Sequence, residues 1–231
     1  MSPTVHHLEQ FATGAADFIL AEARRAITER GLFRVALSGG NTPRAVHAEL
    51  VRRAGDLPWD RVQITFGDER CVPPEDPQSN YRMAKESLLD AVPIPPGNVF
   101  RMRGEIAPQA AADEYERLLA AVAARFGEAR YAHDLLLLGL GEDGHTASLF
   151  PRSPALEVTD SNVIPATGPK PPPQRLTFTF PLINAARQVA FLVNDPAKQP
   201  IIDRIIAGQG GEFPASRVQP SSGAVTWLLG K

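Results

Sequence analysis

The stretch DLLLLGLGEDGH, residues 134–145, joins an uninterrupted apolar run to a glycine-rich turn with charged residues. A run of leucines without polar alternation is typical of a strand that is buried on both faces of a parallel sheet. The run is far shorter than the roughly 20 apolar residues that cross a bilayer. We therefore predict a central strand over residues 134–138 and a functional turn at its carboxyl end.

Segments on both sides of this strand alternate between β-rich runs and amphipathic periods. Further strands are predicted over residues 32–37, 61–66, 177–180, 188–193 and 225–229, with a short candidate over 98–101. Helices are predicted over residues 5–30, 78–91, 108–126 and 196–207. Another helix is predicted to start at Thr42 as cap, with Pro43 in its first turn. Strands that alternate with helices predict an α/β fold: a single Rossmann-like domain over residues 1–231, with a mostly parallel sheet and helices on both faces.

Composition narrows the possible partners and the compartment. With 43% hydrophobic residues among 231, the chain can bury a substantial core, and its formal net charge of −2 favours neither nucleic acid nor a membrane as partner. Cys71 is the only cysteine, which fits a reducing compartment. The polar N-terminus, with His6 and His7, does not resemble a signal peptide. We expect a cytoplasmic protein that is a monomer or a weak homodimer.

The motif SGGNTP, residues 38–43, lies at a predicted strand-to-helix turn. Gly39 and Gly40 let the backbone approach a ligand closely, and Asn41 and Thr42 begin a helix whose free amides and dipole attract phosphate. An ordinary turn with a helix cap explains the same residues equally well.

The motif FGDER, residues 66–70, follows the strand predicted over 61–66. Ligands of open α/β sheets bind at the carboxyl ends of strands, so Asp68 and Arg70 face the expected cleft. The guanidinium of Arg70 suits a bidentate grip on phosphate. Taken alone, the motif is better explained as a solvated loop held by an Asp–Arg pair.

The turn GLGEDGH, residues 139–145, formally matches the dinucleotide fingerprint G-x-G-x-x-G. Pro151 would truncate the helix that this fingerprint needs, and Asp160 lies in a polar loop rather than at a strand end. The turn instead presents the imidazole of His145 beside Asp143, as a general base with an orienting carboxylate. Backbone amides around the glycines could stabilise an oxyanion.

The remaining candidate groups favour structural roles. We expect His6, His7, His47 and His133 to be surface or packing residues, and Cys71 to pack as a small hydrophobic side chain. The chain has no G-x-S-x-G, P-loop, H-E-x-x-H or paired cysteines. Serine nucleophiles and zinc catalysis therefore lose support, and we expect directly activated water with no metal and no organic cofactor.

At these motifs the chain resembles the 6-phosphogluconolactonase family. The matching stretches are SGGNTP (38–43), GDERCVP (67–73), SNYRM (79–83), GLGEDGHTASLFP (139–151) and PKPPPQRLTFTFPLIN (169–184). They follow the family's order and spacing and span most of the chain. The resemblance implies hydrolysis of a small phosphorylated sugar lactone, 6-phospho-D-glucono-1,5-lactone, to 6-phosphogluconate in the oxidative pentose phosphate pathway.

The resemblance also implies roles for individual residues. His145 would be the general base, and Asp143 and Asp68 would orient the imidazole, the water or the sugar. The phosphate would be held by Arg70, Lys170 and the backbone of Gly39, Gly40, Asn41 and Thr42, with Arg175 as a further candidate. The prolines around Lys170 would stiffen the loop that delivers it.

Three other functions fit parts of the same pattern. Amino-sugar-phosphate deaminases of this superfamily carry a glutamate five residues after the histidine, where this chain has Phe150, and an Asp-Glu-Tyr stretch where it has Asp68-Glu69-Arg70. A non-catalytic sugar-phosphate-binding regulator would have lost the histidine and would carry a DNA-binding segment. A dehydrogenase would need the dinucleotide fingerprint. We expect the lactonase, with the deaminase and the regulator as alternatives.

Overall fold

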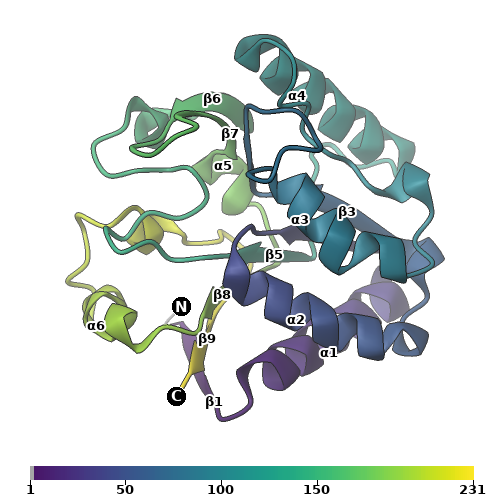
Figure 1. Cartoon of the computed structure of the whole chain (residues 1–231), viewed down its shortest axis with the longest axis horizontal. Helices are drawn as coiled ribbons and strands as arrows, with labels where there is room; N and C mark the ends of the chain where they lie inside the picture. The colour runs from purple at the N-terminus through teal and green to yellow at the C-terminus, as the bar shows by residue number, and fades with distance from the viewer. Residues whose placement is uncertain (1–2) are drawn as a thin grey trace.

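Six strands form the central sheet of the computed structural model, which describes residues 3–231 (Figure 1). They are β1 (Thr4–Leu8), β2 (Phe33–Leu37), β3 (Val62–Phe66), β5 (Leu135–Leu138), β8 (Gln188–Val193) and β9 (Ala224–Gly230). Their order across the sheet is β1-β9-β8-β5-β2-β3, and every neighbouring pair is parallel. The predicted α/β class with a mostly parallel sheet is confirmed.

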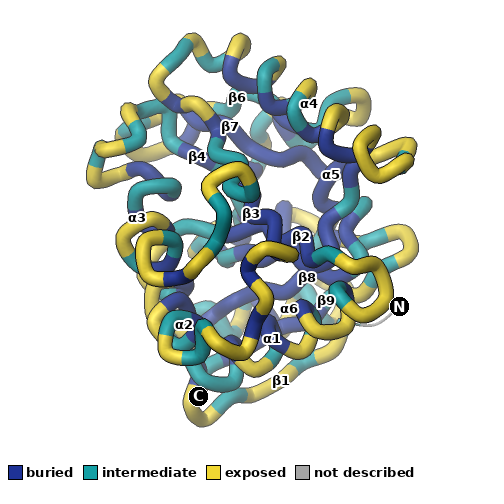
Figure 2. The backbone as a smooth tube through the Cα atoms, turned by 90° about the vertical axis from the view of Figure 1, so that its right-hand side faces the viewer, coloured by how far each residue is buried: buried dark blue, intermediate teal, exposed yellow. Residues whose placement is uncertain are grey.

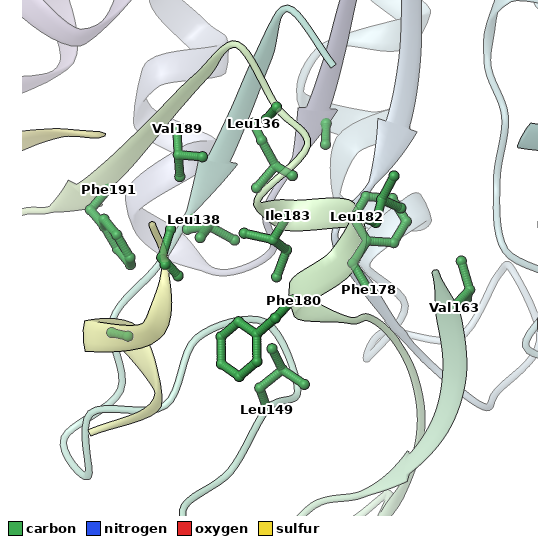
Figure 3. Packing of buried hydrophobic residues seen from close by; sticks show 14 of the residues in the cluster. Leu136, Leu138, Leu149, Val163, Phe178, Phe180, Leu182, Ile183, Val189 and Phe191 are labelled. Carbon is green, nitrogen blue, oxygen red and sulfur yellow. The ribbon is translucent and has the colours of Figure 1, made fainter. Parts of the chain in front are cut away.

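Helices cover both faces of this sheet. One face packs against α1 (Phe11–Arg30), α2 (Asn41–Arg52) and α3 (Asn80–Ser87), and the other against α4 (Pro108–Arg125), α5 (Phe180–Ile183) and α6 (Gln199–Ile206). Strand β5 shows the division. Leu135 and Leu137 join the core of α1 and α2, while Leu136 and Leu138 join the core drawn in Figure 3, because successive strand side chains face opposite sides. In Figure 2 the buried strands lie between these layers.

A second sheet lies beside the first, and the sequence predicted only part of it. It consists of β4 (Asp68–Arg70), β7 (Gln174–Phe178) and β6 (Val163–Thr167), with both pairs antiparallel. The strand predicted over residues 177–180 overlaps β7 at its end, while Phe180 begins α5. We predicted a loop at β4 and nothing at β6. Strand β4 reads Asp-Glu-Arg, and Asp and Glu are depleted in strands, so only its pairing with β7, about a hundred positions away in the sequence, makes it a strand.

The predicted helix over residues 5–30 is wrong at its start. Residues Thr4–Leu8 form the edge strand β1, which pairs with β9 from the other end of the chain, and α1 begins at Phe11. His6 and His7 are therefore exposed on a strand rather than on a helix. Residues 5–8 could be included in the helical period of α1, because nothing in the local sequence indicates that they pair with β9.

Two smaller predictions also differ from the structure. Helix α2 begins at Asn41 after Gly40, and no side chain caps it, so Thr42 is not the cap. Residues 98–101 form no strand; Val99 makes a single bridge to Ile64. Within the described residues no helix has the length and apolarity needed to cross a membrane.

Candidate active site

Four neighbouring parallel strands deliver the candidate residues to one edge of the sheet. Strands β8, β5, β2 and β3 are adjacent, and their carboxyl ends lead into residues 194–198, 139–145, 38–43 and 67–70. The chain order reverses between β2 and β5, since β3 lies on one side and β8 and β9 on the other. Ligands of open α/β sheets bind at this kind of switch point.

Two adjoining cavities lie at that edge, with volumes of about 260 and 450 Å³. Both are lined by the same central residues, which are Asp68, Arg70, Gly141, His145, Ala147 and Lys198. The smaller cavity adds the loop 38–43 and Asn80, and the larger adds Asp143, Lys170 and Arg175 among others. Because they share a wall, the cavities are two halves of one cleft.

His145 and Asp143 form a hydrogen-bonded pair in this cleft. Nδ1 of His145 lies 2.5 Å from Oδ1 of Asp143, and the same oxygen accepts the His145 amide at 3.1 Å. Burial disfavours the Asp143 anion, but these bonds outweigh burial and lower the pKa of its carboxyl group. An ionised carboxylate only accepts, so Nδ1 carries the proton and Nε2 keeps a lone pair. The pair is therefore arranged as an oriented general base.

The turn that carries His145 depends on close backbone packing. The Gly141 amide donates to the His145 carbonyl at 2.8 Å, and Gly144 has a φ of 77°. A Cβ atom on Gly141 would lie 2.0 Å from His145 Nδ1. The ring of Phe150 also packs against the imidazole, with ring centroids 4.6 Å apart. Gly141 and Phe150 together hold the imidazole in place.

Asp68 is held by two neutral donors. The Ser148 hydroxyl donates to its Oδ2 at 2.7 Å, and Nδ2 of Asn80 donates to its Oδ1 at 2.9 Å. Asn80 also packs against the loop 38–43, because a Cβ on Gly39 would lie 2.0 Å from its Oδ1. Asp68 and the loop are thus fixed relative to each other.

Two arginines lie opposite each other on adjacent strands of the second sheet. Arg70 of β4 and Arg175 of β7 are paired in the antiparallel register, where like charges repel. Nη1 of Arg70 donates to the Gln78 carbonyl at 3.0 Å, and Nη2 of Arg175 to the Lys170 carbonyl at 3.3 Å. Burial, and then the charge of Arg70, lower the pKa of Arg175. An anion between them would relieve this repulsion.

The loop 38–43 meets the cleft at the amino end of α2. Gly40 precedes the helix with a φ of 103°, and no side chain bonds its first amides. These amides are left for a ligand, and the helix dipole favours an anion there. Lys198, from the segment that follows β8, lines both cavities beside this loop.

All the predicted site residues line the cleft, but some line only one of its two cavities. Gly39, Gly40, Asn41 and Thr42 line only the smaller cavity, whereas Asp143, Lys170 and Arg175 line only the larger. Asp68, Arg70 and His145 line both. Sequence reasoning missed Lys198, Asn80 and Ser148. Lys198 could have been found, since it follows a predicted strand end as the other site residues do.

The remaining histidines and the cysteine lie outside the cleft. Burial, and then a nearby arginine, lower the pKa of His47 to about 4 and that of His133 to about 3. Both are packed and neutral, as predicted. Cys71 is half-buried against the hydrophobic core, also as predicted. Within residues 3–231, no group of three or more His, Cys, Asp or Glu side chains could hold a metal ion.

Comparisons with known proteins agree with this architecture. Residues 6–227 match the family described as Glucosamine-6-phosphate isomerases/6-phosphogluconolactonase. A 6-phosphogluconolactonase of Synechocystis is 46% identical over 212 residues, covering 89% of this chain and 85% of the relative. The human 6-phosphogluconolactonase is 38% identical over 205 residues, covering 87% and 79%. The solved 6-phosphogluconolactonase of Thermotoga maritima superimposes with a TM-score of 0.86 at 28% identity, over 99% of this chain and 100% of that one. The chain belongs to the glucosamine-6-phosphate isomerase/6-phosphogluconolactonase family.

Proposed function

We propose that this protein hydrolyses 6-phospho-D-glucono-1,5-lactone to 6-phosphogluconate, in the oxidative branch of the pentose phosphate pathway. The observation that carries the proposal is the His145–Asp143 pair, placed in a cleft that is lined by Arg70, Lys170, Arg175 and Lys198. The named relatives, 38% and 46% identical, support the same activity.

The chemistry begins with a water molecule between His145 and the lactone carbonyl. Nε2 of His145 accepts a proton from this water as its oxygen bonds to C1. The ionised Asp143 stabilises the imidazolium that forms. The tetrahedral intermediate then collapses, the bond from C1 to the ring oxygen breaks, and His145 returns its proton to that oxygen. Asp68, held by Ser148 and Asn80, accepts a hydrogen bond from the water or a sugar hydroxyl.

Binding of the phosphorylated substrate rests on the cleft's donors. They are the backbone of Gly39, Gly40, Asn41 and Thr42 and the side chains of Arg70, Lys170, Arg175 and Lys198. Charged hydrogen bonds of this kind contribute about 1.5–3 kcal/mol each. The amino-sugar deaminase is less well supported, because the residue where it would carry a glutamate is Phe150, whose apolar ring packs on the imidazole.

We further propose that residues 1–231 act as one domain, as a monomer or weak homodimer in the cytoplasm. Phe126 is the only large hydrophobic side chain that is exposed among the described residues, at 48%, and the Arg34 guanidinium lies over its ring. Little apolar surface is therefore left for a tight subunit interface. A light-scattering mass that stays dimeric at nanomolar concentration would contradict the weak association.

The proposed activity is tested by NMR of freshly prepared 6-phospho-D-glucono-1,5-lactone, with and without the protein. The lactone also opens spontaneously, so the two time courses must be compared at the same pH. We expect a faster decay of the lactone signals and an equal growth of 6-phosphogluconate signals. Identical time courses at micromolar protein would show that the protein is not this hydrolase.

Activity is expected to be independent of divalent metal, because His145 can activate water without one and no metal-ligand cluster exists within residues 3–231. Dialysis against EDTA should leave kcat and KM unchanged, measured with the dialysed protein before and after adding Mg²⁺ or Zn²⁺. Loss of turnover on dialysis that either ion restores would contradict direct activation by histidine.

Lys198→Met is expected to weaken the binding of phosphorylated lactone by roughly 10- to 150-fold, the equivalent of one charged hydrogen bond. Lys198 lines the same cavity as the first residues of α2, whose free amides attract the same anion. Unphosphorylated glucono-1,5-lactone should be hydrolysed with nearly unchanged kcat/KM. The matched control is Lys85→Met, which removes a lysine paired with Asp90 outside the cleft. Equal losses on both lactones would mean that Lys198 does not contact the phosphate.

A further inference from the structure

The two halves of the cleft share Arg70 and Lys198 but differ in their other anion-binding groups. In the smaller cavity, the loop 38–43 offers uncapped amides at the start of α2, and Lys198 lies beside them. Several amides that converge on one point, at the positive end of a helix dipole, suit the many acceptor oxygens of a phosphate.

The larger cavity has a different donor set. Arg175 is 7% exposed, and its Nε atom has no hydrogen-bond partner within residues 3–231. Its register partner is Arg70, and Lys170 extends from the hairpin loop between β6 and β7. Two guanidinium groups and an ammonium group gathered at one place, with a guanidinium largely withdrawn from water, form a site that is incomplete without an anion.

Acidic groups also face the larger cavity, and they do not neutralise these cations. Asp68 is bonded by Ser148 and Asn80, and Asp143 by His145. The third, Glu142, is exposed and has no ion pair within residues 3–231. None of the three forms an ion pair with Lys170 or Arg175 in that part of the chain.

The product of the proposed reaction carries two anionic groups, whereas the substrate carries one. The lactone carries one, its phosphate, while the product carries a phosphate at one end and a new carboxylate at C1. The catalytic His145 lies where the two cavities meet, and its partner Asp143 lines only the larger. With the phosphate at α2 and C1 at His145, the oxygens of C1 lie on the side of Lys170 and Arg175.

We propose that Lys170 and Arg175, instead of adding to the phosphate site, form a carboxylate subsite. It binds the C1 oxyanion as it develops and then the product carboxylate, while α2 and Lys198 hold the phosphate. This rests on the proposed function. Because the lactone has no charge at C1, the subsite attracts the transition state and product more than the substrate. Arg70, which lines both halves, separates the two anions.

The test compares two ligands that differ only at C1: 6-phosphogluconate, with a carboxylate, and glucitol 6-phosphate, with a neutral alcohol. Calorimetry gives their Kd values for the wild-type protein and for Lys170→Met and Lys198→Met. Lys170→Met should raise the Kd of 6-phosphogluconate by roughly 10- to 100-fold and leave the Kd of glucitol 6-phosphate unchanged. Lys198→Met should raise the Kd values of both ligands by a similar factor.

Turnover provides a second measurement that separates the subsites. Lys170→Met should lower kcat by the same factor on phosphorylated and unphosphorylated gluconolactone, since both develop charge at C1. Arg175→Lys, which keeps the charge but loses the bidentate fork, should change product affinity in the same direction.

The opposite ligand pattern would overturn the inference. If Lys170→Met weakens glucitol 6-phosphate as much as 6-phosphogluconate, Lys170 binds the phosphate and there is no carboxylate subsite. If the wild-type protein neither hydrolyses the lactone nor binds 6-phosphogluconate, the proposed function itself is wrong and the subsite is wrong with it.

Discussion

Replacing His145 with glutamine is expected to lower kcat by roughly 10²–10⁴-fold, the usual contribution of a positioned general base. Glutamine keeps a hydrogen-bonding side chain of similar reach but cannot take a proton from water. Its amide nitrogen can still donate to Asp143, so the turn should keep its shape. The side chain is 31% exposed, so the free energy of unfolding should change little.

The measurements are kcat on the phosphorylated lactone, the melting temperature, and the Kd of 6-phosphogluconate, all on one preparation. The matched control is His6→Gln, which changes an exposed histidine of β1 outside the cleft. A His145→Gln protein that melts normally, binds product normally and turns over at the wild-type rate would show that His145 is not the base. A protein with normal kcat in its folded fraction but a lower melting temperature would indicate a packing role.

Gly141→Ala is expected to lower kcat by about 10²-fold although it removes no group that takes part in proton transfer. The added methyl carbon would lie 2.0 Å from His145 Nδ1, which no real structure tolerates. The imidazole must therefore move away from Asp143 or from the cleft. A displacement of about 1 Å at a reacting group is sufficient for a loss of this size.

Gly139→Ala is the control for this change, since a Cβ there would meet no atom within 4 Å and the same loop carries it. Its kcat should stay near that of the wild type. Equal kcat values for the two alanine variants would contradict the proposed packing of Gly141 against the imidazole.

The candidate site was predictable from the sequence where its residues follow buried strands directly. His145, Arg70 and the loop 38–43 each follow within seven positions a strand that is buried throughout, and parallel strands bring their carboxyl ends to one edge. Lys198 follows β8 in the same way, but it lies five residues past the end of the strand in a segment without glycines.

The partners of the site residues could not be predicted in this way. Ser148 and Asp68 are 80 positions apart, and Asn80 meets Gly39 across the start of two helices. Such contacts depend on how α3 and the second sheet pack, and no local pattern encodes them. The same holds for the pairing of Arg70 with Arg175, which exists only because β4 and β7 are neighbours.

The sequence by itself determined the α/β class, the central strands β2, β3, β5, β8 and β9, and the motifs 38–43, 66–70 and 139–145 that follow three of these strands. It could do so because apolar runs and helical periods are local properties of the chain. The tertiary structure alone decided that Thr4–Leu8 is a strand, that Asp68–Arg70 joins a second sheet, and that Lys170 and Arg175 line a different cavity from the loop 38–43. Each of these depends on segments far apart in sequence, whose pairing is stabilised only when the whole core has formed.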